Sequence, residues 1–129
     1  MLSSRLYARE IQILNTLFSS GHPMTAQDIV RENPGLSQST VQAIVRKLCN
    51  SGLVEVVEMV QSGYVQARAF KGAEKAKQEA LMYMLDEYQK ISGILSIAEV
   101  ADAMLATETD DQKRINILRE VIRIVSQQN

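Results

Sequence analysis

The chain has 129 residues and a formal net charge of −1, and 46% of its residues are hydrophobic. This length can bury one good core, or two small ones in a dimer, and the hydrophobic share is ordinary for a folded domain. The net charge excludes a polycation that binds nucleic acid by bulk charge alone. Residues 1–75 carry 8 Lys and Arg against 6 Asp and Glu, whereas residues 76–129 carry 6 against 9. This asymmetry fits a nucleic-acid module joined to a part that does not touch nucleic acid.

Cysteine content and hydropathy limit the compartment and the class of protein. Cys49 is the single cysteine, so an intramolecular disulfide is excluded and nothing indicates secretion. No stretch approaches the roughly 18 apolar residues of a membrane-spanning helix, and the N-terminus lacks a signal-peptide pattern. We therefore expect a cytoplasmic protein without a membrane partner. Aromatic residues are few and tryptophan is absent, which argues against a single-strand binder that stacks bases.

Residues 5–35 predict two helices separated by turns. The first helix spans 5–19, has an apolar stripe at helical spacing, and ends at Gly21-His22-Pro23. The stripe contains Tyr7, Ile11, Leu14 and Phe18, widened by Leu6, Ile13 and Leu17. Met24 is expected to be extended, and Thr25 should cap a short second helix in a capping box with Asp28. Residues 33–35 (Asn-Pro-Gly) form a turn, because a proline disfavours the helical region for the residue before it.

The third predicted helix, 38–51, has a defined start, a defined end and two contrasting faces. Ser37 is a good N-cap residue, and Gly52 suits a left-handed C-terminal cap. At about 100° per residue, one face is apolar and should be buried. That face consists of Val41, Ile44, Val45 and Leu48. Two helices joined by a tight turn that contains glycine are typical of a helix-turn-helix motif.

The opposite face of this helix combines hydrogen-bonding and cationic groups and has no acidic residue. It carries Ser39, Gln42, Ala43, Arg46 and Asn50, with Lys47 at its flank and Thr40 at its side. A merely solvated face would normally include Glu or Asp, whereas this set suits base edges and phosphates of double-stranded DNA. Arg46 and Gln42 are candidates for base edges, because Arg pairs with guanine and Gln with adenine. Ser39, Thr40 and Lys47 are expected nearer the phosphate backbone, although Thr40 could simply complete the first turn.

After Gly52 the pattern changes to that of a β-hairpin. Residues 53–60 are β-branched, residues 61–63 form the expected turn, and residues 64–70 alternate. A hairpin directly after a recognition helix is the wing of a winged helix, and it must pack on the helices to be stable. Arg68 is a candidate for a phosphate or minor-groove contact, with a solvated strand cation as the alternative. Residues 71–72 (Lys-Gly) are expected to be the hinge between the two halves.

The second half predicts three further helices. A seam at coiled-coil spacing, interrupted at 92–93, consists of Leu81, Met84, Tyr88 and Ile91. Capping boxes at 96–99 and 109–112 open two more helices. The last helix has an apolar stripe that consists of Ile115, Leu118, Ile122 and Val125. Three helices in roughly 55 residues seldom fold alone. We therefore expect residues 73–128 to form a two-fold homodimer through these two sets of side chains.

The remaining candidate sites favour structural roles. The sequence lacks a nucleophile elbow, a phosphate-binding loop and metal-ligand spacing, so neither an enzyme nor a cofactor is expected. His22 has no neighbouring ligands and is interpreted as a structural loop residue. Cys49 lies at the margin of the buried stripe and fits a small core residue. The alternative for Cys49 is a thiol sensor whose pKa Lys47 and Arg46 would lower.

Residues 5–71 resemble the penicillinase repressor family, of the BlaI and MecI type. The resemblance is carried by MTAQDIV at 24–30 and LSQSTVQAIVRKLCNSGLV at 36–54, followed by the wing. Members are dimeric winged-helix repressors with a small helical dimerisation domain after the wing. The resemblance therefore implies a recognition helix whose DNA contacts are Ser39, Thr40, Gln42 and Arg46. The chain lacks the Asn-Phe pair at which some members are cleaved and the C-terminal cysteine cluster of copper-responsive relatives, so the resemblance implies no inducing signal.

We therefore predict a mainly α protein of α+β class, with a winged helix-turn-helix DNA-binding domain at 1–71 and a three-helix dimerisation domain at 72–129. The expected function is transcriptional repression by a homodimer on a palindromic operator in double-stranded DNA. One alternative is a winged-helix protein-interaction or adaptor module, which the near-neutral charge and the uncharged wing tip favour. Another is a regulator with a small-molecule pocket lined by Tyr83, Tyr88 and methionines. An inducer, either a small molecule or a protein, would be the further partner.

Overall fold

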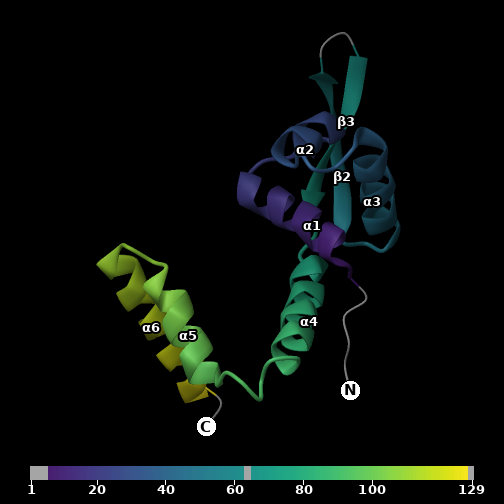
Figure 1. The fold of residues 1–129 in the computed structure, drawn as a ribbon. Coiled ribbons are helices and arrows are strands. Elements are labelled where there is room, and N and C mark those ends of the chain that lie inside the picture. The colour runs from purple at the N-terminus through teal and green to yellow at the C-terminus, as the bar shows by residue number, and fades with distance from the viewer. Residues whose placement is uncertain (1–5, 63–64, 128–129) are drawn as a thin grey trace. The chain divides into compact units, whose positions relative to one another are not determined.

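The order of helices and strands follows the predicted pattern. The computed structural model describes residues 6–62 and 65–127. These residues form six helices and three strands (Figure 1). The elements are α1 (Ala8–Ser20), β1 (Met24–Thr25), α2 (Ala26–Glu32), α3 (Gln38–Asn50), β2 (Val54–Ser62), β3 (Val65–Gly72), α4 (Lys75–Gln89), α5 (Ile97–Ala106) and α6 (Asp111–Gln127). The prediction of a mainly α chain, with a winged helix followed by three helices, is confirmed.

Helix α1 buries the middle of the predicted stripe, at Ile13, Leu14 and Leu17, but not its two ends. It begins at Ala8, because Tyr7 is extended and the Glu10 Oε1 atom accepts a hydrogen bond from the Tyr7 N–H at 2.9 Å. Tyr7 and Phe18, at the ends of the predicted stripe, are 70% and 40% exposed. The buried residues are Glu10, Ile13, Leu14 and Leu17. The apolar pattern is too broad to define the centre of the buried face, and it does not reveal that an acid can enter that face when a cation from another helix meets it.

Helices α2 and α3 begin at the predicted capping residues. The Thr25 side chain accepts a hydrogen bond from the Asp28 N–H, and the Asp28 carboxylate accepts one from the Thr25 N–H, each at 3.1 Å. The predicted capping box is therefore confirmed. At the start of α3 the Ser37 hydroxyl accepts from the Thr40 N–H at 3.1 Å. After α3, Gly52 has the left-handed φ of 77° that a residue without Cβ adopts at little cost.

The turn between α2 and α3 is held by a buried asparagine that the sequence does not single out. The Asn33 side-chain amide donates to the Ile29 carbonyl at 2.7 Å and to the Thr16 hydroxyl at 3.2 Å. The Gln12 amide donates to the Asn33 side-chain oxygen at 2.9 Å. Since buried polar groups need such partners, these bonds fix the turn against α1.

The three strands form an antiparallel sheet in the order β1-β3-β2. Met24 of β1 pairs with Phe70, so the predicted extended residue is confirmed. The β2–β3 ladder continues to the pair of Ser62 and Val65. The predicted turn at 61–63 is therefore wrong for its first two residues, because the backbone ladder includes both of them. Residues 63–64 lie outside the described part of the chain.

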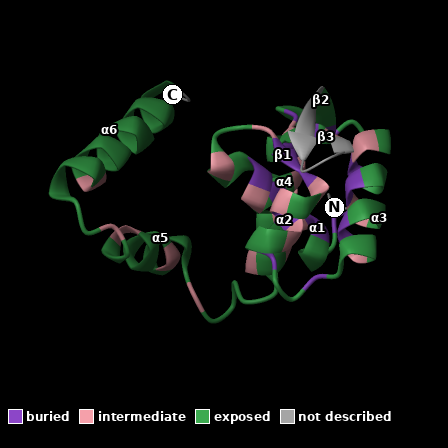
Figure 2. Ribbon diagram, turned by 90° about the horizontal axis from the view of Figure 1, so that it is seen from above, coloured by how far each residue is buried: buried purple, intermediate pink, exposed green. Residues whose placement is uncertain are grey.

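The core lies among the first three helices and the sheet. Its largest fully buried side chains are Ile13, Ile29, Val41 and Leu48. In Figure 2 the buried residues, in purple, lie where α1, α2 and α3 face one another. The predicted stripe of α3 is confirmed for Val41, Val45 and Leu48, whereas Ile44 is half-buried. Burying each such side chain contributes about 1.5–3 kcal/mol to folding.

The first compact unit extends beyond the predicted hinge. Gly72 pairs with Val54 in the sheet, and Ala76 of α4 is buried. A Cβ atom at Gly72 would overlap the Phe18 ring, so the ring packs closely on this backbone. The chain divides into compact units at 1–87 and 88–129, rather than at 1–71 and 72–129. The predicted hinge at 71–72 is wrong because the backbone ladder, which side-chain pattern does not show, includes both residues.

Helix α4 ends before the predicted seam does. Gln89 is its last residue, and Ile91 lies in the turn that follows. The Tyr88 hydroxyl donates to the Leu95 carbonyl at 2.9 Å and closes this turn. Ile91 therefore does not continue the helical stripe to which the sequence pattern assigns it.

The predicted cap is confirmed for α5 but not for α6. Ser96 and Glu99 form the predicted capping box, with both hydrogen bonds at 3.1 Å. At α6, the Asp110 carboxylate accepts from the Gln112 N–H at 2.9 Å. Asp110 therefore caps the helix in place of the predicted Thr109, because a carboxylate is the stronger acceptor at the positive end of a helix.

The two helices of the second unit bury no residue in the single chain. All described residues of α5 and α6 are exposed or half-buried, as the green and pink ribbons of Figure 2 show. Ile122 is 65% exposed and Val125 is 52% exposed. A soluble domain normally covers such an apolar set. Among the described helices, none combines the length and the hydropathy needed to cross a membrane.

We expect Leu48→Ala to lower the free energy of unfolding by about 2–5 kcal/mol, because it opens a cavity beneath α3 where Leu48 is 1% exposed. Urea denaturation followed by circular dichroism measures the change. Gln42→Ala on the exposed face of the same helix is the control and should stay within about 0.5 kcal/mol of the parent. A loss below about 1 kcal/mol for Leu48→Ala would contradict this account of the core.

Candidate nucleic-acid interface

Because α3 buries one side, its polar side faces solvent. The exposed residues of this side are Ser39, Gln42, Ala43, Arg46, Lys47 and Asn50. Thr40 is half-buried. None of these residues is acidic, so α3 presents donors, acceptors and two cations to whatever approaches it.

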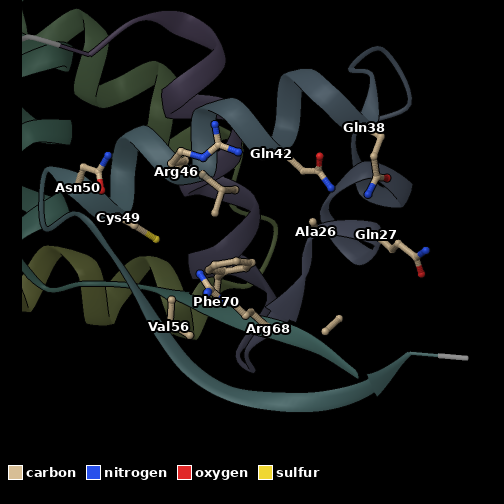
Figure 3. A pocket seen from close by; sticks show the side chains of 12 residues that line it. Ala26, Gln27, Gln38, Gln42, Arg46, Cys49, Asn50, Val56, Arg68 and Phe70 are labelled. Atoms are coloured by element: carbon tan, nitrogen blue, oxygen red, sulfur yellow. The ribbon is translucent and has the colours of Figure 1, made fainter. Parts of the chain in front are cut away.

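An open groove of about 540 Å³ runs between α3, the start of α2 and the strands of the wing. Four of the predicted DNA-binding residues line it: Gln42, Arg46, Asn50 and Arg68. Figure 3 shows the first three on α3 and Arg68 on the facing strand β3. The fold thus brings together two arginines that are 22 positions apart in the sequence. Guanidinium groups on two sides of a groove suit an anionic strand and the base edges beside it.

Two glutamines of the groove are absent from the predicted DNA-binding residues. Gln27 and Gln38 lie in the first turns of α2 and α3, and their side chains line the same groove (Figure 3). An amide can donate and accept, so both extend the polar rim. Only the packing of α2 against α3 brings these helix starts together, and no signal in the sequence marks them.

The wall of the groove includes Cys49, together with the apolar side chains of Val45, Val56 and Phe70. Burial raises the pKa of the Cys49 thiol above its ordinary value, and the charge of Arg68 offsets only part of this rise. The thiol-sensor hypothesis required a pKa lowered by Lys47 and Arg46. That direction is wrong, because desolvation of the thiolate outweighs the cation, and the cation that acts is Arg68.

Ser39, Thr40 and Ala43 lie outside the groove lining. The Ser37 hydroxyl donates to the Thr40 hydroxyl at 2.8 Å and lies 3.3 Å from that of Ser39. These hydrogen bonds tie Thr40 to the N-terminal cap of α3. These three residues lie in the first two turns of α3, and none of them lines the groove that contains Arg68.

Lys47 points toward α1 and not into the groove. Its Nζ atom lies 2.6 Å from the Glu10 Oε2 atom and 4.9 Å from the centre of the Tyr7 ring. The hydrogen bond with Glu10 raises the pKa of Lys47 above its ordinary value. Glu10 is only 4% exposed, so its carboxylate is a buried charge that this lysine neutralises. The sequence pattern did not single out Glu10, because the partner lies 37 positions away.

The described residues contain no group of His, Cys, Asp and Glu side chains that could hold a metal ion. The His22 Nδ1 atom lies 3.0 Å from the Pro23 carbonyl oxygen, within its own loop. Tyr83, a candidate for a small-molecule pocket, packs against the core of the first unit. Tyr88, the second candidate, closes the turn after α4.

Residues 6–123 match the family model described as penicillinase repressor. No curated protein sequence matches the chain. The structure of the transcriptional regulator PcaV from Streptomyces coelicolor, in complex with its natural ligand, is similar with a TM-score of 0.53 and 20% identity, over 98% of this chain and 79% of that chain.

Two further solved structures are similar. The heme sensor protein PefR from Streptococcus agalactiae has a TM-score of 0.51 and 15% identity, over 96% of this chain and 75% of that chain. The MarR family regulator NMB1585 from Neisseria meningitidis has a TM-score of 0.47 and 22% identity, over 96% and 82%. At these identities the PcaV and PefR structures show a shared winged-helix fold and nothing about ligands.

We expect the Cys49 thiol to react with iodoacetamide more slowly at pH 8 than a cysteine in the unfolded chain, because a raised pKa leaves less thiolate. Mass spectrometry of the alkylated protein at several pH values gives the rate and its midpoint. Arg68→Ala should move that midpoint to still higher pH, since the opposing charge is removed. A midpoint below the ordinary cysteine value of about 8.5 would contradict this assignment.

Proposed function

Since the chain belongs to the penicillinase repressor family of DNA-binding transcriptional regulators, we propose that it represses transcription as a homodimer bound to a palindromic operator. The observation that carries the proposal is the acid-free side of α3, which shares one groove with Arg68 of the wing. Two α3 helices related by a two-fold axis would enter successive major grooves of the duplex. The bound dimer would then block access to the promoter.

The chemistry of the groove supports a division of roles among its side chains. Arg46 suits the O6 and N7 atoms of guanine, and Gln42 suits the N6 and N7 atoms of adenine. Asn50 and Arg68 also line the groove and are proposed as contacts to the DNA backbone. Ser39 and Thr40, near the start of α3, are proposed as further backbone contacts, and the Ala43 methyl group suits the methyl group of thymine.

Exposed apolar side chains support the homodimer. Neither α5 nor α6 buries a residue, so a second copy is the partner that would cover both at once. The residues proposed for the interface are Leu81, Met84, Tyr88, Ile91, Ile115, Leu118, Ile122 and Val125. All of these are exposed except Tyr88, which is half-buried. A second copy that covered these side chains would bury apolar surface, as the core of a stable interface requires.

We expect Arg46→Ala to weaken operator binding by about 1–3 kcal/mol and to relax the preference at one base pair, because a bidentate base contact is lost. Selection from a random duplex pool at two salt concentrations, followed by gel shifts, measures both effects. Arg31→Ala removes an exposed arginine that lies outside the groove and serves as the control. Equal affinity and equal preference with and without Arg46 would refute this role. A parent protein without salt-dependent duplex binding would instead indicate an adaptor.

We expect Leu118→Arg together with Ile122→Arg to convert the dimer to a monomer, because two charges would lie in a desolvated interface. Sedimentation velocity measures the change in mass, and operator affinity should fall by at least about tenfold, since the two half-sites are no longer linked. Asn116→Arg adds one such charge on another side of α6 and should leave the dimer intact. A double variant that stays dimeric would rule out this surface as the interface.

A further inference from the structure

Lys47 links helix α3 to helix α1 through an ion pair. It lies on α3 directly after Arg46, and its Nζ atom is 2.6 Å from the carboxylate of Glu10 on α1. The second carboxylate oxygen of Glu10 accepts from the Tyr7 N–H at 2.9 Å, so both oxygens are used. The Glu10 side chain is 5% exposed, whereas that of Lys47 is 54% exposed. The pair is therefore buried at its acidic end and open at its basic end.

We propose that Glu10 is a positioning residue for DNA recognition, which acts by holding Lys47 and thereby fixing the rotation of α3 against α1. This inference rests on the proposed function of α3 as the recognition helix. Lys47 is then directed inward to Glu10 and does not serve as a phosphate contact, the role that its position in the sequence suggests.

The apolar contacts of α3 cannot supply this restraint alone. Val41, Val45 and Leu48 bury α3 strongly, but the hydrophobic effect has no direction and tolerates small rotations. A short charge-assisted hydrogen bond has a preferred length and direction. Because a helix turns as one body, holding Lys47 also sets the directions of Gln42, Arg46 and Asn50. Those three side chains line the groove, so a small rotation would displace each of them from a base edge.

The Tyr7 ring protects the pair on its open side. Its centre lies 4.9 Å from the Lys47 Nζ atom, a distance at which the ring face attracts a cation. Lys47 therefore meets a carboxylate on one side and an aromatic ring on another. If Lys47 left Glu10 and Tyr7 to bind a phosphate, Glu10 would gain no other cation. Its buried negative charge would then be uncompensated beside an anionic duplex.

The test compares E10Q, K47M, K47R and the double variant E10Q/K47M in the full chain. K71M is the matched control, because Lys71 also pairs with a glutamate, Glu55 at 3.6 Å, but at an exposed site outside the groove. Operator affinity is measured by gel shift at four salt concentrations, and base preference by selection from a random duplex pool. Urea denaturation of each variant reports folding separately.

We expect E10Q and K47M each to lower operator affinity by about tenfold and to broaden the preference at the base pairs read by α3. Neither should change the slope of affinity against salt, since no phosphate contact is lost. E10Q/K47M should bind no worse than K47M, because residues in contact are not additive. K47R should retain the parent preference, and K71M should resemble the parent throughout.

The proposal is overturned if K47M lowers the slope of log affinity against log salt concentration by about one while E10Q keeps the affinity and base preference of the parent. That result would make Lys47 a phosphate contact. Additive effects of E10Q and K47M would overturn it as well. A parent that binds no duplex in a salt-dependent manner refutes the proposed function, and the pair is then judged by urea denaturation alone. In that case additive changes in the unfolding free energy would show that Glu10 does not hold α3 through Lys47.

Discussion

Burial of one side of α3 is the constraint on which the rest of the structure depends. Val41, Val45 and Leu48 are withdrawn from water against α1, α2 and the sheet. Because side chains point outward all around a helix, burying one side of α3 leaves the opposite, acid-free side in solvent. The caps at Ser37 and Gly52 set where that side begins and ends. The exposure of the polar, acid-free side of α3 is thus a consequence of how its opposite side packs.

The wing adds the second wall of the interface. Strands β2 and β3 of the wing pair with each other, and β3 also pairs with β1 at the start of α2. This pairing connects Arg68 to the helix-turn-helix through the backbone and not through a flexible linker. The groove between wing and α3 therefore has walls that belong to one core, which suits a ligand as stiff as duplex DNA.

The two halves of the chain differ in how far they cover their apolar side chains from water. The first unit buries its own apolar residues, including Ile13 and Ile29, which are completely buried. The described residues of α5 and α6 bury none. An apolar surface that its own chain does not cover is typical of association with a partner, and a two-fold partner is the one proposed above.

The amino-acid sequence by itself determined the helix periods, the caps at Thr25, Ser37 and Ser96, and the polar content of the exposed side of α3. These features are local, because each depends on residues within about one turn of helix. Only the tertiary structure decided that Gln27 and Gln38 join the groove, that Glu10 is buried against Lys47, and that the first unit continues beyond Gly72. The physical reason is the same in all three cases: the partners lie far apart in the sequence, and packing and backbone pairing between distant segments leave no periodic trace in either one.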